Sequence, residues 1–248
     1  MVRMMVRTFS VVLIMGSITV MGVYFYQIYN NNKIYKEIRN EVELEQREDE
    51  SEETMTEEER LSLKHAYLSN INKDTVGWIH VPDTVIDYPV VMGENNRYYL
   101  NKDFKKNIAN AGAIFMDYRN QDTIKDKHII IYGHHMKDGS MFKELVEYKN
   151  KDFFENSKII MFETPESITQ WEVFSVYVTD VGFNYIETNF NTDAQFLSFI
   201  KTIQKKSKFN SKIILDATDR ILTLSTCTYE MKNARFVVHA RQIDNATK

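Results

Sequence analysis

The stretch RILTLSTCTYEMKNARFVVHAR, residues 220–241, contains two short runs that are typical of β-strands, separated by a polar turn. The first run alternates apolar and hydroxyl side chains between Ile221 and Ser225, which is the pattern of a strand with one buried face. The second run, ARFVVHAR, has Arg235 near its start. A hairpin between the two runs would return Arg235 to the end of the first strand, where Cys227 stands.

Cys227 is the only cysteine in the 248 residues, which excludes an intramolecular disulfide and a multi-cysteine zinc site. An unpaired thiol in an oxidising compartment is a liability unless it is buried or used. Two interpretations remain open from this residue alone, an inert core thiol and a nucleophile near a strand end. A nucleophilic cysteine needs a partner that produces the thiolate, usually a histidine, and a donor for the developing oxyanion.

The histidine partner is expected in the stretch IIIYGHHMKDGSMF, where His134 and His135 follow a buried-looking strand and Gly133. The other histidines fall in a peripheral helix or within strands: His65, His80, His128 and His239. Adjacent strand residues point to opposite faces, and the chain has no H-E-x-x-H motif, so we expect no metal and no cofactor. Arg235 is the candidate oxyanion donor, with a surface ion pair as the alternative.

The body of the chain, from residue 60 onward, is predicted to be mostly strand. The expected strands are Thr84–Val91, Ala113–Met116, His128–Tyr132, Lys158–Phe162, Trp171–Val178, Lys212–Leu215, Arg220–Thr226 and Arg235–Arg241. Helices are expected near residues 61–68, at Met141–Tyr148 and at Ala194–Gln204. Strands and helices do not alternate strictly, which disfavours a doubly wound parallel sheet. The pattern favours a mostly β fold, a closed or nearly closed barrel with helical insertions.

Composition and charge narrow the classes of partner. Hydrophobic residues make up 43% of the chain, which is enough for a folded core. The formal net charge of −4 comes from residues 41–59, which hold eleven acids and one base, while residues 60–248 are close to neutral. We therefore expect no nucleic-acid partner, because the body has no excess of basic residues.

The N-terminus predicts a membrane anchor. Arg3 and Arg7 precede an uncharged, largely apolar stretch, residues 8–26, and 19 residues of helix span about 28 Å, roughly the hydrocarbon thickness of a bilayer. The two arginines indicate a cytoplasmic N-terminus, with residues 30–248 outside the cytoplasm. The alternative is a cleaved secretory signal, but the stretch is longer than a usual signal core and no A-x-A-like site follows it.

The predicted domain organisation has three parts. Residues 1–29 are the cytoplasmic N-terminus and transmembrane anchor, residues 30–59 an acidic spacer, and residues 60–248 the catalytic domain. The spacer carries scattered apolar residues at Ile34, Ile38, Val42 and Leu44. This spacing permits a solvated helix, and self-repulsion of the acidic run would hold the domain off the membrane.

Several spaced motifs together resemble a class B sortase of Gram-positive bacteria. They are TLSTC with an arginine eight residues later, YGHHMKDGSMF, GWIHVPDTVIDYPVV, YYLNKDF, GAIFMDYRN and YIETNF. The resemblance covers about residues 60–243. It implies a β-barrel of about eight strands with an N-terminal helical extension, and a helix-containing insertion before the catalytic strand.

The resemblance also implies the site residues. Cys227 would be the nucleophile, His134 the acid and base, and Arg235 the cation that stabilises the oxyanion or positions the substrate. The groove for the substrate would be lined by Ser225, Tyr185, Ile186, Leu100 and Asn96. Some members of the class carry an acid where this chain has Thr228.

The activity implied is transpeptidation at the cell surface. The partners would be secreted proteins with an NPxTN-like or PxTG-like sorting signal, a peptidoglycan precursor amine, and the membrane through the N-terminal helix. Two other functions use the same residues differently. One is an extracytoplasmic cysteine protease with water as the acceptor, and the other is a membrane-anchored binding protein in which Cys227 is inert.

Overall fold

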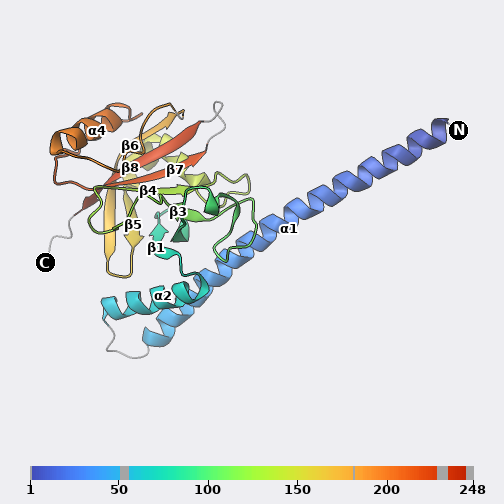
Figure 1. Cartoon of the computed structure of the whole chain (residues 1–248), viewed down its shortest axis with the longest axis horizontal. Helices are drawn as coiled ribbons and strands as arrows, with labels where there is room; N and C mark the ends of the chain where they lie inside the picture. Colours follow the sequence, from blue (N-terminus) through green and yellow to red (C-terminus); the bar gives the residue numbers. More distant parts are fainter. Residues whose placement is uncertain (1, 51–55, 181, 228–233, 244–248) are drawn as a thin grey trace.

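A computed structural model describes residues 2–50, 56–180, 182–227 and 234–243 (Figure 1). The described residues form a closed barrel of eight strands in the order β1-β2-β3-β4-β7-β8-β6-β5, which confirms the predicted fold class. The strands are β1 (Thr75–His80), β2 (Asp87–Met92), β3 (Ile114–Met116), β4 (His128–Gly133), β5 (Ile159–Glu163), β6 (Ile168–Thr179), β7 (Ile221–Cys227) and β8 (Arg235–Ile243).

Helical elements lie outside the barrel wall. They are α1 (Val2–Glu50), α2 (Glu57–Ile71), η1 (Tyr98–Asn101), η2 (Lys143–Lys149), α3 (Lys151–Asn156) and α4 (Asp193–Lys205). Helix α2 begins at Thr56 with a capping box, in which the Thr56 hydroxyl accepts from the Glu59 amide and the Glu59 carboxylate accepts from the Thr56 amide. The helix predicted at Met141–Tyr148 is present as the 3-10 helix η2, which begins two residues later and ends one residue later.

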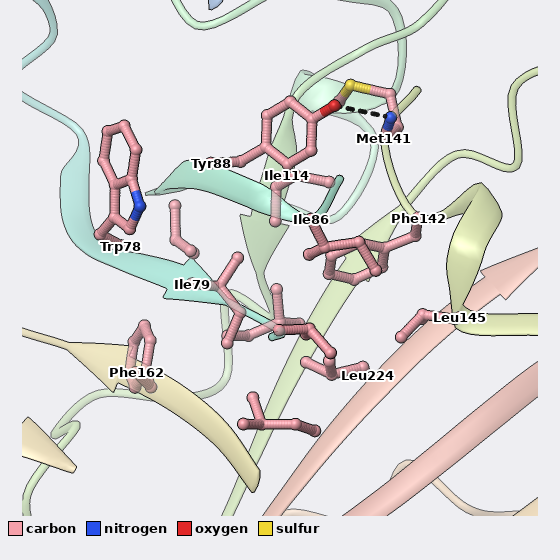
Figure 2. Packing of buried hydrophobic residues seen from close by; sticks show 14 of the residues in the cluster. Trp78, Ile79, Ile86, Tyr88, Ile114, Met141, Phe142, Leu145, Phe162 and Leu224 are labelled. Atoms are coloured by element: carbon pink, nitrogen blue, oxygen red, sulfur yellow. Dashed lines mark hydrogen bonds between the residues drawn. The ribbon is translucent and has the colours of Figure 1, made fainter. Parts of the chain in front are cut away.

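The interior of the barrel is a continuous apolar core (Figure 2). Ile79 of β1, Ile114 of β3 and Leu224 of β7 are fully buried and meet Phe142 and Leu145 from the segment after β4. This packing joins side chains from both halves of the chain and stabilises the closed barrel.

Strand β1 was not among the eight strands listed from the sequence, although His80 was placed in an early strand, and it is the strand that closes the barrel. It pairs with β2 on one side and with β5 on the other. Gly77 interrupts the apolar pattern of residues 75–80, and this interruption concealed the strand in the sequence. A Cβ at Gly77 would lie 2.4 Å from the Glu163 carbonyl oxygen and 2.6 Å from the Phe162 ring, so glycine is required where β1 approaches β5.

The strand predicted at Lys212–Leu215 was wrong. This segment pairs with no strand among the described residues. Its side chains alternate in burial: Ile213 and Leu215 pack against the cluster beneath α4, whereas Ile214 is 86% exposed. An extended chain lying on an apolar surface shows the same period of two as a paired strand, which is why the pattern misled.

Helix α1 packs against the barrel domain through its second half. It contains the one described helical stretch long and apolar enough to cross a membrane, Arg7–Leu44. We expected a solvated helix over the spacer, but Ile34, Tyr35, Ile38 and Val42 are buried in the main core. Their spacing of three to four residues puts them on one face of the helix.

Polar contacts fix this face of α1 in place. The Tyr35 hydroxyl donates to the carbonyl oxygen of Gly112 at 3.3 Å, and the Arg39 guanidinium donates to the carbonyl oxygen of Asp87 at 3.1 Å. The Tyr35 ring also meets Tyr88 edge to face, with ring centroids 5.2 Å apart. The second half of α1 therefore belongs to the folded domain.

Two truncations test this assignment. A protein that lacks residues 1–29 should remain folded, because the side chains described in this part of α1 are exposed or at most half-buried and none belongs to the buried core. A protein that lacks residues 1–44 should lose several kcal/mol of unfolding free energy, because four buried side chains disappear and full burial of each is worth roughly 1.5–3 kcal/mol. Urea unfolding of both proteins checks the difference. Equal stability of the two would show that the helix face contributes nothing.

Candidate active site

A groove lies where three neighbouring strands meet at one edge of the barrel. Strand β4 runs parallel to β7, with Gly133 opposite Thr226, so both strands end at this edge. Strand β8 runs antiparallel to β7 and begins here, with Arg235 opposite Cys227. The hairpin predicted from the sequence is therefore present. His134, directly after β4, stands next to the end of the strand that carries Cys227.

The groove belongs to the outer face of the barrel wall. In β7, Leu222 and Leu224 pack into the barrel core, so Ser225 takes the outer face by alternation. In β4 the same alternation gives the outer face to Tyr132 and His134. A second apolar cluster, formed by α4 and the segment 183–190 against β6, β7 and β8, covers the neighbouring part of this outer face.

The groove encloses a cavity of about 530 Å³. Its lining includes every predicted site residue whose side chain the structure describes, namely His134, Arg235, Ser225, Tyr185, Ile186, Leu100 and Asn96. Cys227 follows the lining residue Thr226 as the last residue of β7. Thr228 lies outside the described residues. The structure thus gathers the predicted residues in one place, and their chemical roles remain predictions.

The orientation of His134 is set by a backbone carbonyl. Its Nε2 lies 2.7 Å from the carbonyl oxygen of Leu100, and because that oxygen can only accept, Nε2 carries a proton. Gly112, at φ +59°, sits against this pair: a Cβ there would lie 2.7 Å from the Leu100 oxygen and 3.0 Å from the His134 ring. Nδ1 is therefore the nitrogen of His134 that can take up and release a second proton.

His135 occupies a different environment. It forms a β-bridge with Met141 and does not line the cavity. Burial lowers its pKa, and the positive charges of Lys143 and Lys149 lower it further. The two adjacent histidines therefore lie in different environments, and only His134 lines the cavity.

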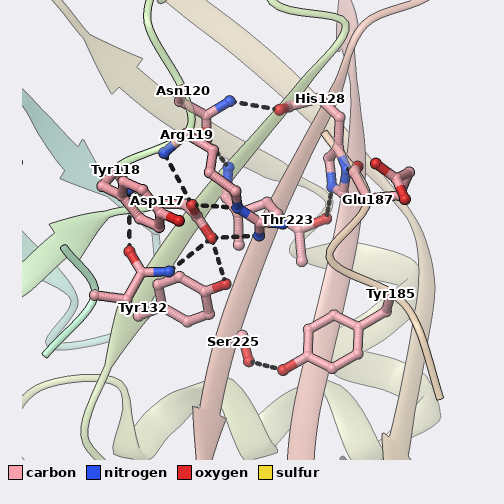
Figure 3. A network of polar contacts seen from close by, with 12 residues as sticks. Asp117, Tyr118, Arg119, Asn120, His128, Tyr132, Tyr185, Glu187, Thr223 and Ser225 are labelled. Carbon is pink, nitrogen blue, oxygen red and sulfur yellow. Dashed lines mark hydrogen bonds and ion pairs between the residues drawn. The ribbon is translucent and has the colours of Figure 1, made fainter. Parts of the chain in front are cut away.

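The floor of the groove is held by a buried carboxylate, Asp117 (Figure 3). It accepts hydrogen bonds from the Arg119 guanidinium at 2.7 and 2.8 Å, from the Tyr132 hydroxyl at 2.8 Å and from the Asn96 amide at 2.9 Å. Burial alone would raise the pKa of Asp117, but these hydrogen bonds, above all those from Arg119, hold it below its usual value. Asp117 is thus charged and fixes Asn96 and Tyr132 in the lining.

Ser225 and Tyr185 form the opposite wall. The Tyr185 hydroxyl and the Ser225 Oγ are 2.9 Å apart, which ties the segment after β6 to the strand that ends in Cys227 (Figure 3). Tyr185 is 6% exposed and packs in the cluster beneath α4. The wall is therefore built from two segments forty residues apart in sequence.

The cavity is also lined by three aromatic residues that sequence reasoning did not single out: Phe115, Tyr132 and Phe183. A signal for Tyr132 was present, because it precedes His134 by two residues and so shares its face of β4. Phe115 and Phe183 lie in segments whose approach to the groove depends on tertiary packing. The described residues contain no group of three His, Cys, Asp or Glu side chains that could hold a metal ion. A histidine and an arginine beside the end of a strand that carries a cysteine are the residue types that nucleophilic catalysis uses.

Comparison with known proteins identifies the family. Residues 79–243 match the sortase domain. The chain is 40% identical over 178 residues to sortase B of Listeria monocytogenes, a match that covers 71% of this chain and 72% of that protein.

Two solved structures are similar over most of the chain. The crystal structure of sortase B from Bacillus anthracis in complex with AAEK1 has a TM-score of 0.77 and 38% identity, covering 88% of this chain and 99% of that one. The Staphylococcus aureus sortase B–substrate complex has a TM-score of 0.76 and 35% identity, covering 86% and 95%. The fold, the ordered motifs and these matches agree, and the chain belongs to the sortase family, within which it is a class B sortase.

Proposed function

We propose that this chain is a membrane-anchored cysteine transpeptidase that cleaves the C-terminal sorting signal of secreted proteins after threonine. It joins the new carboxyl end to a cell-wall amine through a thioacyl-enzyme. The observation that carries the proposal is the meeting of His134, Arg235 and the end of the Cys227 strand around one groove. Family membership supports the same reaction class.

The first half of the reaction forms the thioacyl-enzyme. The Cys227 thiolate, paired with protonated His134, attacks the threonine carbonyl carbon, and Arg235 stabilises the oxyanion that develops. When the tetrahedral intermediate collapses, the peptide C–N bond breaks and His134 gives its Nδ1 proton to the leaving amine. Because Leu100 holds Nε2–H, this proton transfer takes place at Nδ1.

The second half transfers the acyl group. An amine of a peptidoglycan precursor attacks the thioester carbonyl and loses a proton to neutral His134. Collapse then breaks the C–S bond, forms the new amide and restores the thiolate with protonated His134. No net oxidation or reduction occurs, and no cofactor enters a step.

The apolar half of α1 supports a single-pass membrane topology for this enzyme. Arg3 and Arg7 precede the apolar segment, which predicts a cytoplasmic N-terminus and an extracytoplasmic groove. Secreted proteins with NPxTN-like or PxTG-like signals are the proposed protein substrates. One relative is described as a sortase B–substrate complex, which supports a substrate-binding role for this chain.

The central experiment incubates the full-length protein in detergent micelles with a library of sorting peptides and a diamine acceptor, with products read by mass spectrometry. We expect cleavage after threonine, a thioacyl adduct on Cys227 and a ligated amide product. Cys227→Ala should abolish all three while circular dichroism stays unchanged, because the chain has no second thiol.

The products separate the alternatives. Hydrolysis with no ligated product at saturating diamine would identify a protease. A wild-type protein that cleaves no peptide, and whose alkylation rate at Cys227 is unaffected by peptides, would identify a binding protein.

His134→Ala should lower kcat by about 10²–10⁴, the usual contribution of a general acid and base. His135→Ala is the matched control, because it removes an adjacent imidazole that lies outside the cavity lining. It should keep kcat within a few-fold of wild type. The check is steady-state peptide cleavage by both variants with equal unfolding midpoints, and similar losses in the two would reject the choice of His134.

Arg235→Ala should lower kcat by about 10²–10³, as expected when one oxyanion donor is removed. Arg235→Lys should recover only a fraction of this loss, because an ammonium is a point charge and lacks the planar fork of donors that a guanidinium offers. Single-turnover acylation rates measure both. Wild-type acylation in Arg235→Ala would remove Arg235 from the mechanism, and full recovery with lysine would assign it a purely electrostatic role.

A further inference from the structure

A continuous chain of buried hydrogen bonds runs across the outer face of the barrel, next to the groove. His128 Nδ1 lies 2.5 Å from the carbonyl oxygen of Glu187, and His128 Nε2 lies 2.6 Å from the Thr223 hydroxyl. The same hydroxyl lies 2.6 Å from His239 Nδ1, and His239 Nε2 lies 2.7 Å from the Tyr177 hydroxyl. The chain thus links β4, β7, β8 and β6 to the segment after β6. The proposed reaction uses none of its members.

The proton positions along these hydrogen bonds follow from the Glu187 carbonyl at one end, which can only accept. The Glu187 carbonyl can only accept, so His128 donates from Nδ1 and, being neutral, accepts at Nε2 from the Thr223 hydroxyl. The Thr223 oxygen must then accept from His239 Nδ1, which leaves His239 Nε2 to accept from the Tyr177 hydroxyl. With both imidazoles neutral, every bond is satisfied only when each ring carries its proton on Nδ1.

The surroundings of the two imidazoles keep them neutral. His128, His239 and Thr223 have no exposed surface. The Phe199 ring of α4 packs against His128 with centroids 5.1 Å apart, and the Phe174 ring stacks on His239 at 6.1 Å. Burial lowers the pKa of His128 to about 4 and that of His239 well below its usual value.

Both ends of the chain touch the segment that walls the groove. At one end, His128 holds the carbonyl of Glu187, directly after the lining residues Tyr185 and Ile186. At the other end, the Tyr177 ring meets the lining residue Phe183 edge to face, with centroids 5.8 Å apart. In Figure 3, Glu187 and Thr223 lie next to His128, and the hydrogen-bonded pair Tyr185 and Ser225 appears lower in the view.

We propose that His128 is a positioning residue for the substrate groove: through the chain Tyr177–His239–Thr223–His128 it holds the Glu187 carbonyl and thereby sets the place of Tyr185 and Ile186 in the wall. The inference deepens the proposed function, on which it rests for the identity of the peptide that fills the groove. Loss of the chain should therefore weaken peptide binding more than it slows the chemistry.

The test compares Thr223→Val with Thr223→Ser in the full-length protein in detergent micelles. Valine has nearly the same volume but severs both central hydrogen bonds, whereas serine keeps them. We expect Thr223→Val to raise KM for the best sorting peptide roughly three- to tenfold, because only a part of the free energy of the two lost hydrogen bonds reaches the groove wall, with kcat within about twofold of wild type. Thr223→Ser should restore KM. His128→Phe, which removes the donor to Glu187, should raise KM at least as much.

Ser175→Ala is the matched control. Its hydroxyl is also buried on the outer face and donates to a carbonyl, that of Ile203 in α4, at 2.7 Å. It should lower the unfolding midpoint but leave KM unchanged. Equal KM values in Thr223→Val and wild type, or an equal rise in Ser175→Ala, would overturn the positioning role.

Nuclear magnetic resonance gives a readout that does not depend on turnover. Nitrogen shifts of His128 and His239 in the wild type should report two neutral rings with the proton on Nδ1. Amide exchange at residues 183–187 should be faster in Thr223→Val than in Thr223→Ser. If the wild type cleaves no sorting peptide, the proposed function fails. The nitrogen shifts and the amide exchange still test whether the hydrogen-bond chain exists and holds residues 183–187 in place. A ring protonated on Nε2, or unchanged exchange in Thr223→Val, would reject it.

Discussion

The parallel pairing of β4 with β7 is the constraint on which the groove depends. Because the two strands run the same way, their ends bring His134 and Cys227 to one edge of the barrel, and the antiparallel β8 returns Arg235 to the same edge. An antiparallel pairing would put His134 at the other end of a six-residue strand, about 20 Å away. A parallel pair also needs a long crossover, and here residues 134–220 supply it, with β5, β6 and α4 in between.

Part of that crossover covers the outer face of the barrel beside the strand ends and so forms one wall of the groove. Segment 183–190 and α4 pack on the outer face of β6, β7 and β8, and they exclude water from the polar groups beneath. In such a low-dielectric layer, satisfied hydrogen bonds are stronger and unsatisfied ones more costly. The Asp117 carboxylate, with donors from Arg119, Tyr132 and Asn96, satisfies this requirement on the floor. These hydrogen bonds therefore hold Asn96 and Tyr132 in the lining of the groove.

The sequence predicted those parts of the fold and site that depend on local pattern. The Arg220–Thr226 and Arg235–Arg241 runs alternate clearly, and their hairpin follows from the short turn between them. Strand β1 was missing from the listed strands because Gly77 breaks its apolar pattern. The glycine is required by a contact with β5, which lies more than eighty residues away in sequence. The alternation of apolar and polar residues at Lys212–Leu215 does correspond to alternating burial, but this segment is not paired with a strand. Residues such as Phe115 reach the groove only through tertiary packing, so no local signal marks them.

The charge of the acidic spacer predicted that the second half of α1 stands away from the domain, but apolar packing holds this half against the domain. The acidic run beyond residue 41 suggested a segment held away from the domain, yet one helix face just before it is buried. The Tyr35 hydroxyl donates to the carbonyl of Gly112, and Gly112 packs against His134 and the Leu100 oxygen that orients its ring. A continuous helix with these contacts fixes the angle between the apolar segment and the groove, which a flexible spacer would leave free. The helix that carries the apolar segment therefore contacts the loop that holds His134.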